Sequence, residues 1–204
     1  MIKLRMMPVG LLGANCYLLC NEETKEAVLI DPGADYPRIK RQLDIDAMSV
    51  KAVLLTHGHF DHCNAVSEFK KDGAKVYIHG ADKILLETDL NMSSLTGEVF
   101  RSFVPDVLVS DGDIITECGI TFSVLHTPGH TAGSVCYLVG DGIFTGDTLF
   151  CMGVGRTDMP TGDAHALENS VRNVLFALNG DYKIYPGHGE TTTLEFERRN
   201  NPYV

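Results

Sequence analysis

An apolar run, Ala52-Val53-Leu54-Leu55, leads directly into Thr56-His57-Gly58-His59-Phe60-Asp61-His62. The apolar residues predict a buried strand, and the next seven residues place three imidazoles and a carboxylate at the end of that strand. Histidine is the commonest metal ligand, and α/β proteins bind ligands beyond the carboxyl ends of their strands. This stretch therefore predicts a metal site. The alternative is an ordinary surface loop with three histidines, which the distant candidate ligands described below disfavour.

The spacing within the motif indicates two ions. His57 and His59 are two positions apart, and in an extended chain such side chains lie on one face, so a single ion can bind both. Asp61 and His62 come as the chain turns into a helix predicted over about residues 63–72, where they are placed to bind a second ion. Cys63 is a weaker candidate, because its neighbours already supply histidine and carboxylate.

Three further apolar runs end in a potential ligand within a glycine-containing turn. The ligands are His130 in residues 127–131, Asp147 in residues 144–148 and His188 in residues 184–188. Glycine allows tight bends in which the backbone approaches an ion closely, while the preceding strand holds the ligand still. Each turn alone is unremarkable in composition, but the set predicts that distant segments converge on one centre.

Length and composition set the class of protein. The chain has 204 residues and is 44% hydrophobic, which predicts one domain over residues 1–204. Its formal net charge of −10 disfavours nucleic acid and acidic membranes as partners. No apolar run approaches the roughly 18 residues of a membrane span, and the first 12 residues have no signal-peptide pattern. We therefore expect a cytoplasmic protein whose six cysteines are reduced core residues.

The periodicity predicts a β-rich chain with alternating helices. We expect a loop-rich rim of the active site over residues 91–105. Helices are predicted over residues 36–43 and 63–72 and from Asp163 to Gly180, and strands over residues 2–7, 15–19, 27–30, 53–55, 75–78, 120–125, 134–139, 143–145 and 183–185.

In the order of these motifs, H-x-H-x-D-H followed by His130, Asp147 and His188, the chain resembles the metallo-β-lactamase superfamily. Residues 127–131 and 146–150 and the loop Gly155-Arg156-Thr157-Asp158 are similar to the glyoxalase II branch, the hydroxyacylglutathione hydrolases. The resemblance implies an α+β fold, a four-layer αββα sandwich. It also implies that one metal is bound by His57, His59 and His130, that a second is bound by Asp61, His62 and His188, and that Asp147 bridges them.

The same resemblance predicts an enzyme that hydrolyses small thioesters, with S-lactoylglutathione as the first candidate. Two ions that share a carboxylate lower the pKa of a bound water toward neutrality. Asp61 and Asp147 are the predicted catalytic residues, Asp61 by binding metal and orienting the water. Asp31 and Thr56 are candidates for holding the imidazoles in place. Arg156 is predicted either to bind a substrate carboxylate or to brace its own loop through Asp158.

Several alternatives stay open at this point. The chain ends soon after His188, so it resembles the short, single-domain bacterial type, without the helical extension that supplies much of the glutathione pocket in two-domain glyoxalase II enzymes. A mononuclear iron persulfide dioxygenase and a lactonase or other ester hydrolase are the rival enzymes, and a non-catalytic metal-binding module is disfavoured because no ligand is lost. Zinc is the expected metal, although iron and manganese suit the same donors. The oligomeric state is open between a monomer and a small homo-oligomer.

Overall fold

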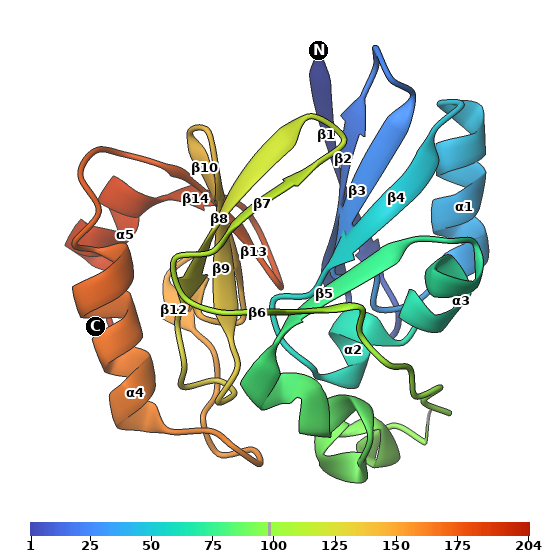
Figure 1. Ribbon diagram of the computed structural model, residues 1–204. Helices are drawn as coiled ribbons and strands as arrows, with labels where there is room; N and C mark the ends of the chain where they lie inside the picture. Colours follow the sequence, from blue (N-terminus) through green and yellow to red (C-terminus); the bar gives the residue numbers. More distant parts are fainter. Residues whose placement is uncertain (98) are drawn as a thin grey trace.

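The computed structural model describes residues 1–97 and 99–204. Two six-stranded sheets lie face to face, with α1 (Tyr36–Ile45) and α3 (Val66–Lys71) outside one sheet and α4 (Ala164–Asn169) and α5 (Leu194–Asn200) outside the other (Figure 1). The first sheet runs β1 (Ile2–Val9), β2 (Ala14–Asn21), β3 (Glu26–Ile30), β4 (Ser49–Leu54), β5 (Lys75–His79) and β6 (Val107–Val109). The second sheet runs β14 (Thr192–Thr193), β13 (Lys183–Pro186), β10 (Gly142–Gly146), β9 (Val135–Val139), β8 (Ile120–His126) and β7 (Ile114–Glu117).

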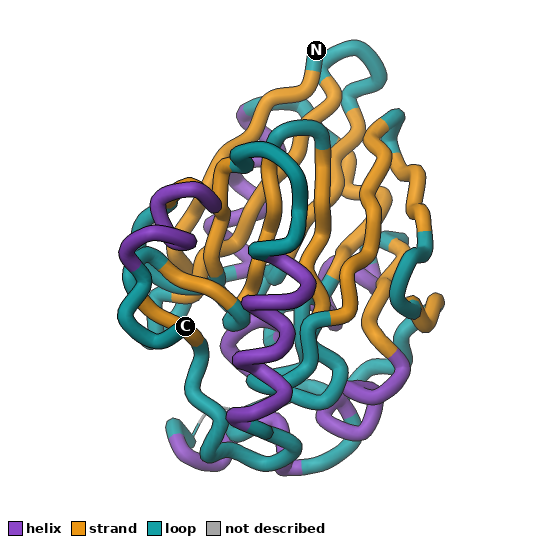
Figure 2. The backbone as a smooth tube through the Cα atoms, turned by 90° about the vertical axis from the view of Figure 1, so that its left-hand side faces the viewer, coloured by secondary structure: helices purple, strands orange, loops and turns teal. Residues whose placement is uncertain are grey.

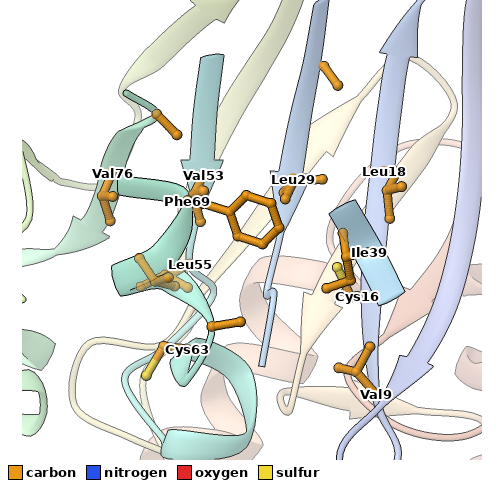
Figure 3. Packing of buried hydrophobic residues seen from close by; sticks show 14 of the residues in the cluster. Val9, Cys16, Leu18, Leu29, Ile39, Val53, Leu55, Cys63, Phe69 and Val76 are labelled. Atoms are coloured by element: carbon orange, nitrogen blue, oxygen red, sulfur yellow. The ribbon is translucent and has the colours of Figure 1, made fainter. Parts of the chain in front are cut away.

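The period of two along the strands sorts the core into layers. In β2, Tyr17 and Leu19 pack between the two sheets, whereas Leu18 packs toward the helices. Figure 3 shows Ile39 of α1 and Phe69 of α3 in this outer cluster, against Leu18 and neighbouring strand residues. A third cluster packs Val171 and Leu175, which follow α4, and Leu194 of α5 against the second sheet. The predicted four-layer αββα sandwich is therefore confirmed.

Strand direction places the ends of many strands at one edge. Strands β3, β4, β5 and β6 are parallel, and β10 is parallel to β13. Parallel neighbours deliver their carboxyl ends to the same edge, and the residues that follow them lie together there. Figure 2 shows the strands side by side, with loops gathered at the end away from the N-terminus. Asp31, Thr56, Asp147 and His188 all lie at or just beyond such strand ends.

Two predicted helices are interrupted. The helix expected over residues 63–72 begins earlier, as α2 (Phe60–Cys63), and resumes as α3, because the backbone N–H of Ala65 donates to Pro32 O instead of continuing the first helix. The helix expected after Asp163 does begin there, with the Asp163 side chain accepting from Ala166 N, but α4 continues as a π-helical segment, η4 (Ser170–Leu175). The Ser170 hydroxyl donates to Pro128 O at the start of η4.

Short elements escaped the sequence analysis. They are β6, β7, β14, α5, and the hairpin strands β11 (Leu149–Phe150) and β12 (Gly153–Val154). Strands of two to four residues carry too little periodicity to be recognised and depend on their partner strands. The 3₁₀ turn η2 (Asp89–Asn91) ends at the first residue of the stretch expected to be a loop, and η3 (Ser93–Leu95) lies within that stretch. Position 98 lies outside the described residues.

The six cysteines are all free, as expected, and five of them are buried. Cys151 is exposed, so its predicted core position is wrong. It lies in the turn between β11 and β12, where the chain is at the surface. Among the described helices, none has the length and apolar character to cross a bilayer. The single domain, the cytoplasmic location and the oligomeric state stay predictions.

Candidate metal centre

Three histidines form the first half of the centre. His57 and His59 follow β4, and His130 follows β8, so the chain brings them together across the gap between the two sheets. Nδ1 of His59 lies 2.9 Å from Nε2 of His130, and all three side chains are buried. Their ligand atoms lie within 4.8 Å of one another, which makes them a group able to hold one metal ion.

Asp61, His62 and His188 form the second group of the same kind. Nε2 of His62 lies 3.3 Å from Nε2 of His188, which is 3.2 Å from an Asp61 carboxylate oxygen. Asp61 and His62 are in α2, which begins at Phe60, and His188 follows β13. The centre is therefore built from both sheets and from the first turn of one short helix.

Asp147 lies between the two groups. Its Oδ1 is 3.3 Å from His62 Nε2, and its Oδ2 is 3.5 Å from His130 Nε2. One carboxylate thus faces a nitrogen of each group, the arrangement of a bridging ligand. The seven residues expected from the sequence are all found at one place.

The donor set fits divalent metal ions. Within the described part of the chain, the buried His57 Nε2 and Asp147 Oδ1 have no hydrogen-bond partner. Buried polar atoms normally have a partner, and an orphaned one calls for an explanation such as an ion. Several imidazole nitrogens and carboxylate oxygens facing one another are the donors that zinc, iron and manganese bind.

Asp31 and Thr56 orient two of the imidazoles. Asp31 accepts from the Thr56 backbone N–H (2.8 Å) and hydroxyl (2.6 Å), and its Oδ2 lies 3.0 Å from His62 Nδ1. Because the Thr56 hydroxyl donates to Asp31, its oxygen is left to accept from His57 Nδ1, 3.1 Å away. Both imidazoles thus have a hydrogen on Nδ1, and this hydrogen bond turns Nε2 of each ring toward the centre. His130 is held in the same way, with Nδ1 donating to Arg156 O at 2.7 Å.

Asp82 is a buried carboxylate that the sequence analysis missed. It lies in η1 (Gly80–Leu86) and accepts from Gly58 N, Thr131 Oγ1 and Gly133 N at 2.7 to 2.9 Å. These donors belong to the loop that carries His57 and His59 and to the loop after His130. Asp82 therefore ties together the two loops of the first group. No local pattern marks it, since its partners are distant in sequence.

The electrostatics of the metal-free centre are uneven. Burial lowers the pKa of His57 well below its usual range, reinforced by the charges of His62 and His130. Burial likewise lowers the pKa of His59 to about 3. Burial opposes the charge on His62, but Asp147, Asp61 and the hydrogen bond to Asp31 prevail and raise its pKa to about 10. In turn, despite burial, His62 and His188 hold the pKa of Asp61 below its usual range. A proton on His62 therefore balances part of the negative charge until a metal replaces it.

A pocket of about 610 Å³ opens onto the centre. This volume is within the usual range for small-molecule sites. His59, Asp61, His130, Asp147 and His188 line it together with apolar side chains and Arg156. The Arg156 guanidinium also makes two 2.7 Å hydrogen bonds to the Asp158 carboxylate, and both side chains are exposed. The geometry is thus compatible with each of the two roles considered for Arg156.

Cys63, the weaker candidate, and the three remaining histidines lie outside the centre. The Cys63 thiol donates to His59 O, 3.1 Å away, and burial raises its pKa well above the usual range, which disfavours the thiolate that a metal needs. His79 and His126 stack on each other with ring centroids 4.2 Å apart. His165 lies in α4. None of the four belongs to a candidate metal group of the described residues.

Comparison with known proteins gives consistent matches. Residues 9–188 match the metallo-beta-lactamase superfamily. The hydroxyacylglutathione hydrolase GloC of Haemophilus influenzae is 36% identical over 209 residues, which span 100% of this chain and 98% of the relative. The structure of BLEG-1, a B3 metallo-beta-lactamase, superposes with a TM-score of 0.92 at 38% identity and covers 98% of this chain and 99% of that one. The structure of TTHA1623 in a di-iron-bound form gives a TM-score of 0.87 at 34% identity, and the match covers 98% of this chain and 100% of that one.

The matched segment runs from the end of β1 to His188, so it includes Asp147 and the two groups assigned to the centre, His57–His59–His130 and Asp61–His62–His188. The expected resemblance is confirmed at the level of the family and of the fold. The chain belongs to the metallo-β-lactamase superfamily.

Proposed function

We propose that this protein is a hydrolase of small thioesters that works with two divalent metal ions, and that glutathione thioesters such as S-lactoylglutathione are its substrates. The observation that carries the proposal is Asp147, shared between two metal-binding groups in the wall of one pocket. We assign the first ion to His57, His59 and His130 and the second to Asp61, His62 and His188, with Asp147 bridging. Zinc is expected first, and iron or manganese suit the same donors.

The overall reaction consumes one water. The thioester carbonyl carbon gains the oxygen of water, the C–S bond breaks, and the products are a carboxylate, a thiol and a proton. Bound divalent ions supply Lewis acidity and lower the pKa of water in such a centre. The chain itself supplies the shaped pocket, the fixed ligands and the groups that orient water and substrate.

We assign to Asp61 the role of orienting the attacking water. Its side chain lines the pocket, and its low pKa keeps it ionised at neutral pH. A fixed carboxylate accepts a hydrogen bond from water and directs the lone pair of that water toward a carbonyl bound in the pocket. Because Asp61 is also assigned to the second ion, its effect on the rate is distinguished from metal binding by measuring the metal content of the same variant.

We assign to Arg156 the role of binding the thiol half of the substrate. Glutathione carries carboxylates, and guanidinium binds carboxylate in a two-pronged geometry. Arg156 lies on the pocket wall while it pairs with the exposed Asp158, a partner that solvent can replace. Changing Arg156→Ala should raise KM for glutathione thioesters several-fold while hydrolysis of an uncharged thioester and metal content stay unchanged. Equal losses on both substrates would identify Arg156 as a brace of its loop.

Support for the thioester assignment comes from the GloC relative, which matches over the full length of this chain. A B3 metallo-beta-lactamase is similar over the same length, which makes a β-lactam a necessary comparison substrate. The di-iron form of TTHA1623 supports a centre for two ions and leaves the choice of metal to experiment.

The test combines elemental analysis of the purified protein with four activity assays. We expect about two metal ions per chain and hydrolysis of S-lactoylglutathione well above that of a lactone or a β-lactam. One bound iron, with persulfide-dependent oxygen uptake and no thioester hydrolysis, would establish the dioxygenase alternative instead. A higher kcat/KM for the lactone or the β-lactam would assign the centre to that substrate class.

A further inference from the structure

The pocket over the metal centre has two walls that are both largely apolar, and one of them also carries an arginine. One wall comes from the first half of the chain, with Leu12 in the turn between β1 and β2, Phe60 at the start of α2, and Met92 and Leu95 around η3. The other comes from the second half, with Phe150 and Val154 of the β11–β12 hairpin followed by Arg156 and Met159. Among the described residues that line the pocket, Arg156 is the one arginine or lysine, and it lies on the second wall.

The first wall, Leu12, Phe60, Met92 and Leu95, is apolar throughout. Apart from the candidate metal ligands, Thr96 is the polar side chain beside it among the described lining residues, and its hydroxyl donates to Ser93 O at 3.2 Å. A hydroxyl on the acyl group, as in lactate, would lose water wherever it lies against these four apolar side chains, which offer it no hydrogen-bond partner. Unpaired burial of a polar group is unfavourable.

Two leucines on this wall are exposed although they face a pocket. Leu12 is 51% exposed and Leu95 is 72% exposed. Covering such side chains with an apolar group releases their hydration water and favours binding. Exposure alone does not distinguish them, since the adjacent Leu11 is 80% exposed. Their position distinguishes Leu12 and Leu95 from Leu11. Leu11 lies outside this pocket, whereas Leu12 and Leu95 line it from separate parts of the chain.

Resting on the proposed thioesterase function, we infer that the preferred substrate carries an apolar acyl chain, which lies along the Leu12–Leu95 wall. The anionic thiol half then lies toward Arg156 on the opposite wall, where charge complementarity places it. The thioester carbonyl lies between them, beside Asp61 and Asp147. The substrate class is therefore alkanoyl thioesters in preference to short hydroxyacyl thioesters.

Two measurements test this inference. In the first, kcat/KM is compared across S-acetyl-, S-butanoyl-, S-hexanoyl- and S-lactoylglutathione. Each buried methylene contributes about 0.8 kcal/mol, so kcat/KM should rise about three- to fourfold per methylene while the chain stays on the wall. In the second, binding of the non-hydrolysable thioethers S-hexylglutathione and S-methylglutathione is measured by calorimetry, and the hexyl compound should bind at least about tenfold more tightly.

Single substitutions test whether Leu12 and Leu95 contact the apolar chain of the ligand. Leu12→Ala and Leu95→Ala should each weaken S-hexylglutathione binding about fivefold or more and leave S-methylglutathione binding within about twofold. Leu11→Ala is the matched control, since it removes the same atoms from the same turn outside the pocket, and it should change neither binding constant.

The outcomes separate the inference from the function on which it rests. Equal binding of the two thioethers, or equal effects of Leu11→Ala and Leu12→Ala, would overturn the inference even if S-lactoylglutathione is hydrolysed. Preferential binding of S-hexylglutathione without hydrolysis of any thioester by the metal-loaded protein would support the apolar wall and refute the thioesterase function.

Discussion

Replacing Gly187 tests whether Asp147 bridges the two metal groups. Gly187 is not a candidate ligand, and a side chain there would crowd the Asp147 carboxylate. A Cβ atom at Gly187 would lie 2.1 Å from Asp147 Oδ1 and 2.8 Å from His62 Cε1. The backbone there is not in the left-handed region, so alanine brings steric crowding and no conformational strain. To restore ordinary contact, the carboxylate oxygen must move by roughly 1 Å.

The displaced oxygen is the one that faces the second group. Asp147 Oδ1 is 3.3 Å from His62 Nε2, whereas Oδ2 faces both groups, at 3.5 Å from His130 Nε2 and 3.7 Å from His188 Nε2. Gly187→Ala should therefore weaken the ion at Asp61, His62 and His188 more than the ion at the three histidines. A misplacement of about 1 Å costs roughly 10²-fold in rate, so we expect kcat to fall by about that factor. Crowding should also lower the free energy of unfolding of the metal-free protein by about 1–3 kcal/mol.

The assay is a titration of metal-free protein with Zn²⁺ against a chromophoric chelator, combined with thioester hydrolysis. Gly80→Ala is the control, since a Cβ there meets no atom within 4 Å in the described structure. The control should bind two ions with unchanged affinity. If Gly187→Ala also binds two ions with wild-type affinity and wild-type kcat, Asp147 does not bridge the two groups.

Three further predictions concern the centre and its supports. Asp61→Asn keeps the size of the side chain but removes its charge, so kcat should fall by roughly 10² with KM less affected; an unchanged kcat in steady-state assays would exclude the orienting role. Asp82→Asn removes the charge of a carboxylate that accepts from backbone N–H groups of two loops. The free energy of unfolding, measured by denaturant unfolding, should fall by about 1–3 kcal/mol. The metal affinity, measured by metal titration, should fall by about 10–100-fold. The exposed Glu87→Gln should change neither quantity, and equal behaviour of the two variants would contradict the bracing role. In the metal-free protein, the pKa of His62 is about 10, so this side chain is protonated at pH 7. Metal binding should therefore release a proton, and the apparent metal affinity should rise as the pH approaches that pKa. Calorimetry in buffers of different ionisation enthalpy measures the proton release, and the absence of release would show that His62 is already neutral.

The sequence by itself was sufficient for the family, the layered fold and the set of candidate ligands. Each of these features can be recognised in a short segment of the sequence. His57, His59, Asp61 and His62 stand together in one motif, and each distant candidate follows an apolar run that can be recognised alone. Their convergence follows from strand direction, because parallel strands bring their carboxyl ends to one edge wherever they fall in the sequence.

The supports of the centre emerged only in the tertiary structure. Nothing in the sequence around Asp82 distinguishes it from the other acidic residues. Its role depends on the fold, in which its carboxylate accepts hydrogen bonds from Gly58 N and Gly133 N. The breaks near Ala65 and Ser170 likewise depend on Pro32 O and Pro128 O, which no helical periodicity reveals. The two walls of the pocket join residues more than a hundred positions apart, such as Leu12 and Phe150. Local spacing determines which side chains can bind a metal, whereas long-range packing and hydrogen bonds determine how they are held and what lies opposite them.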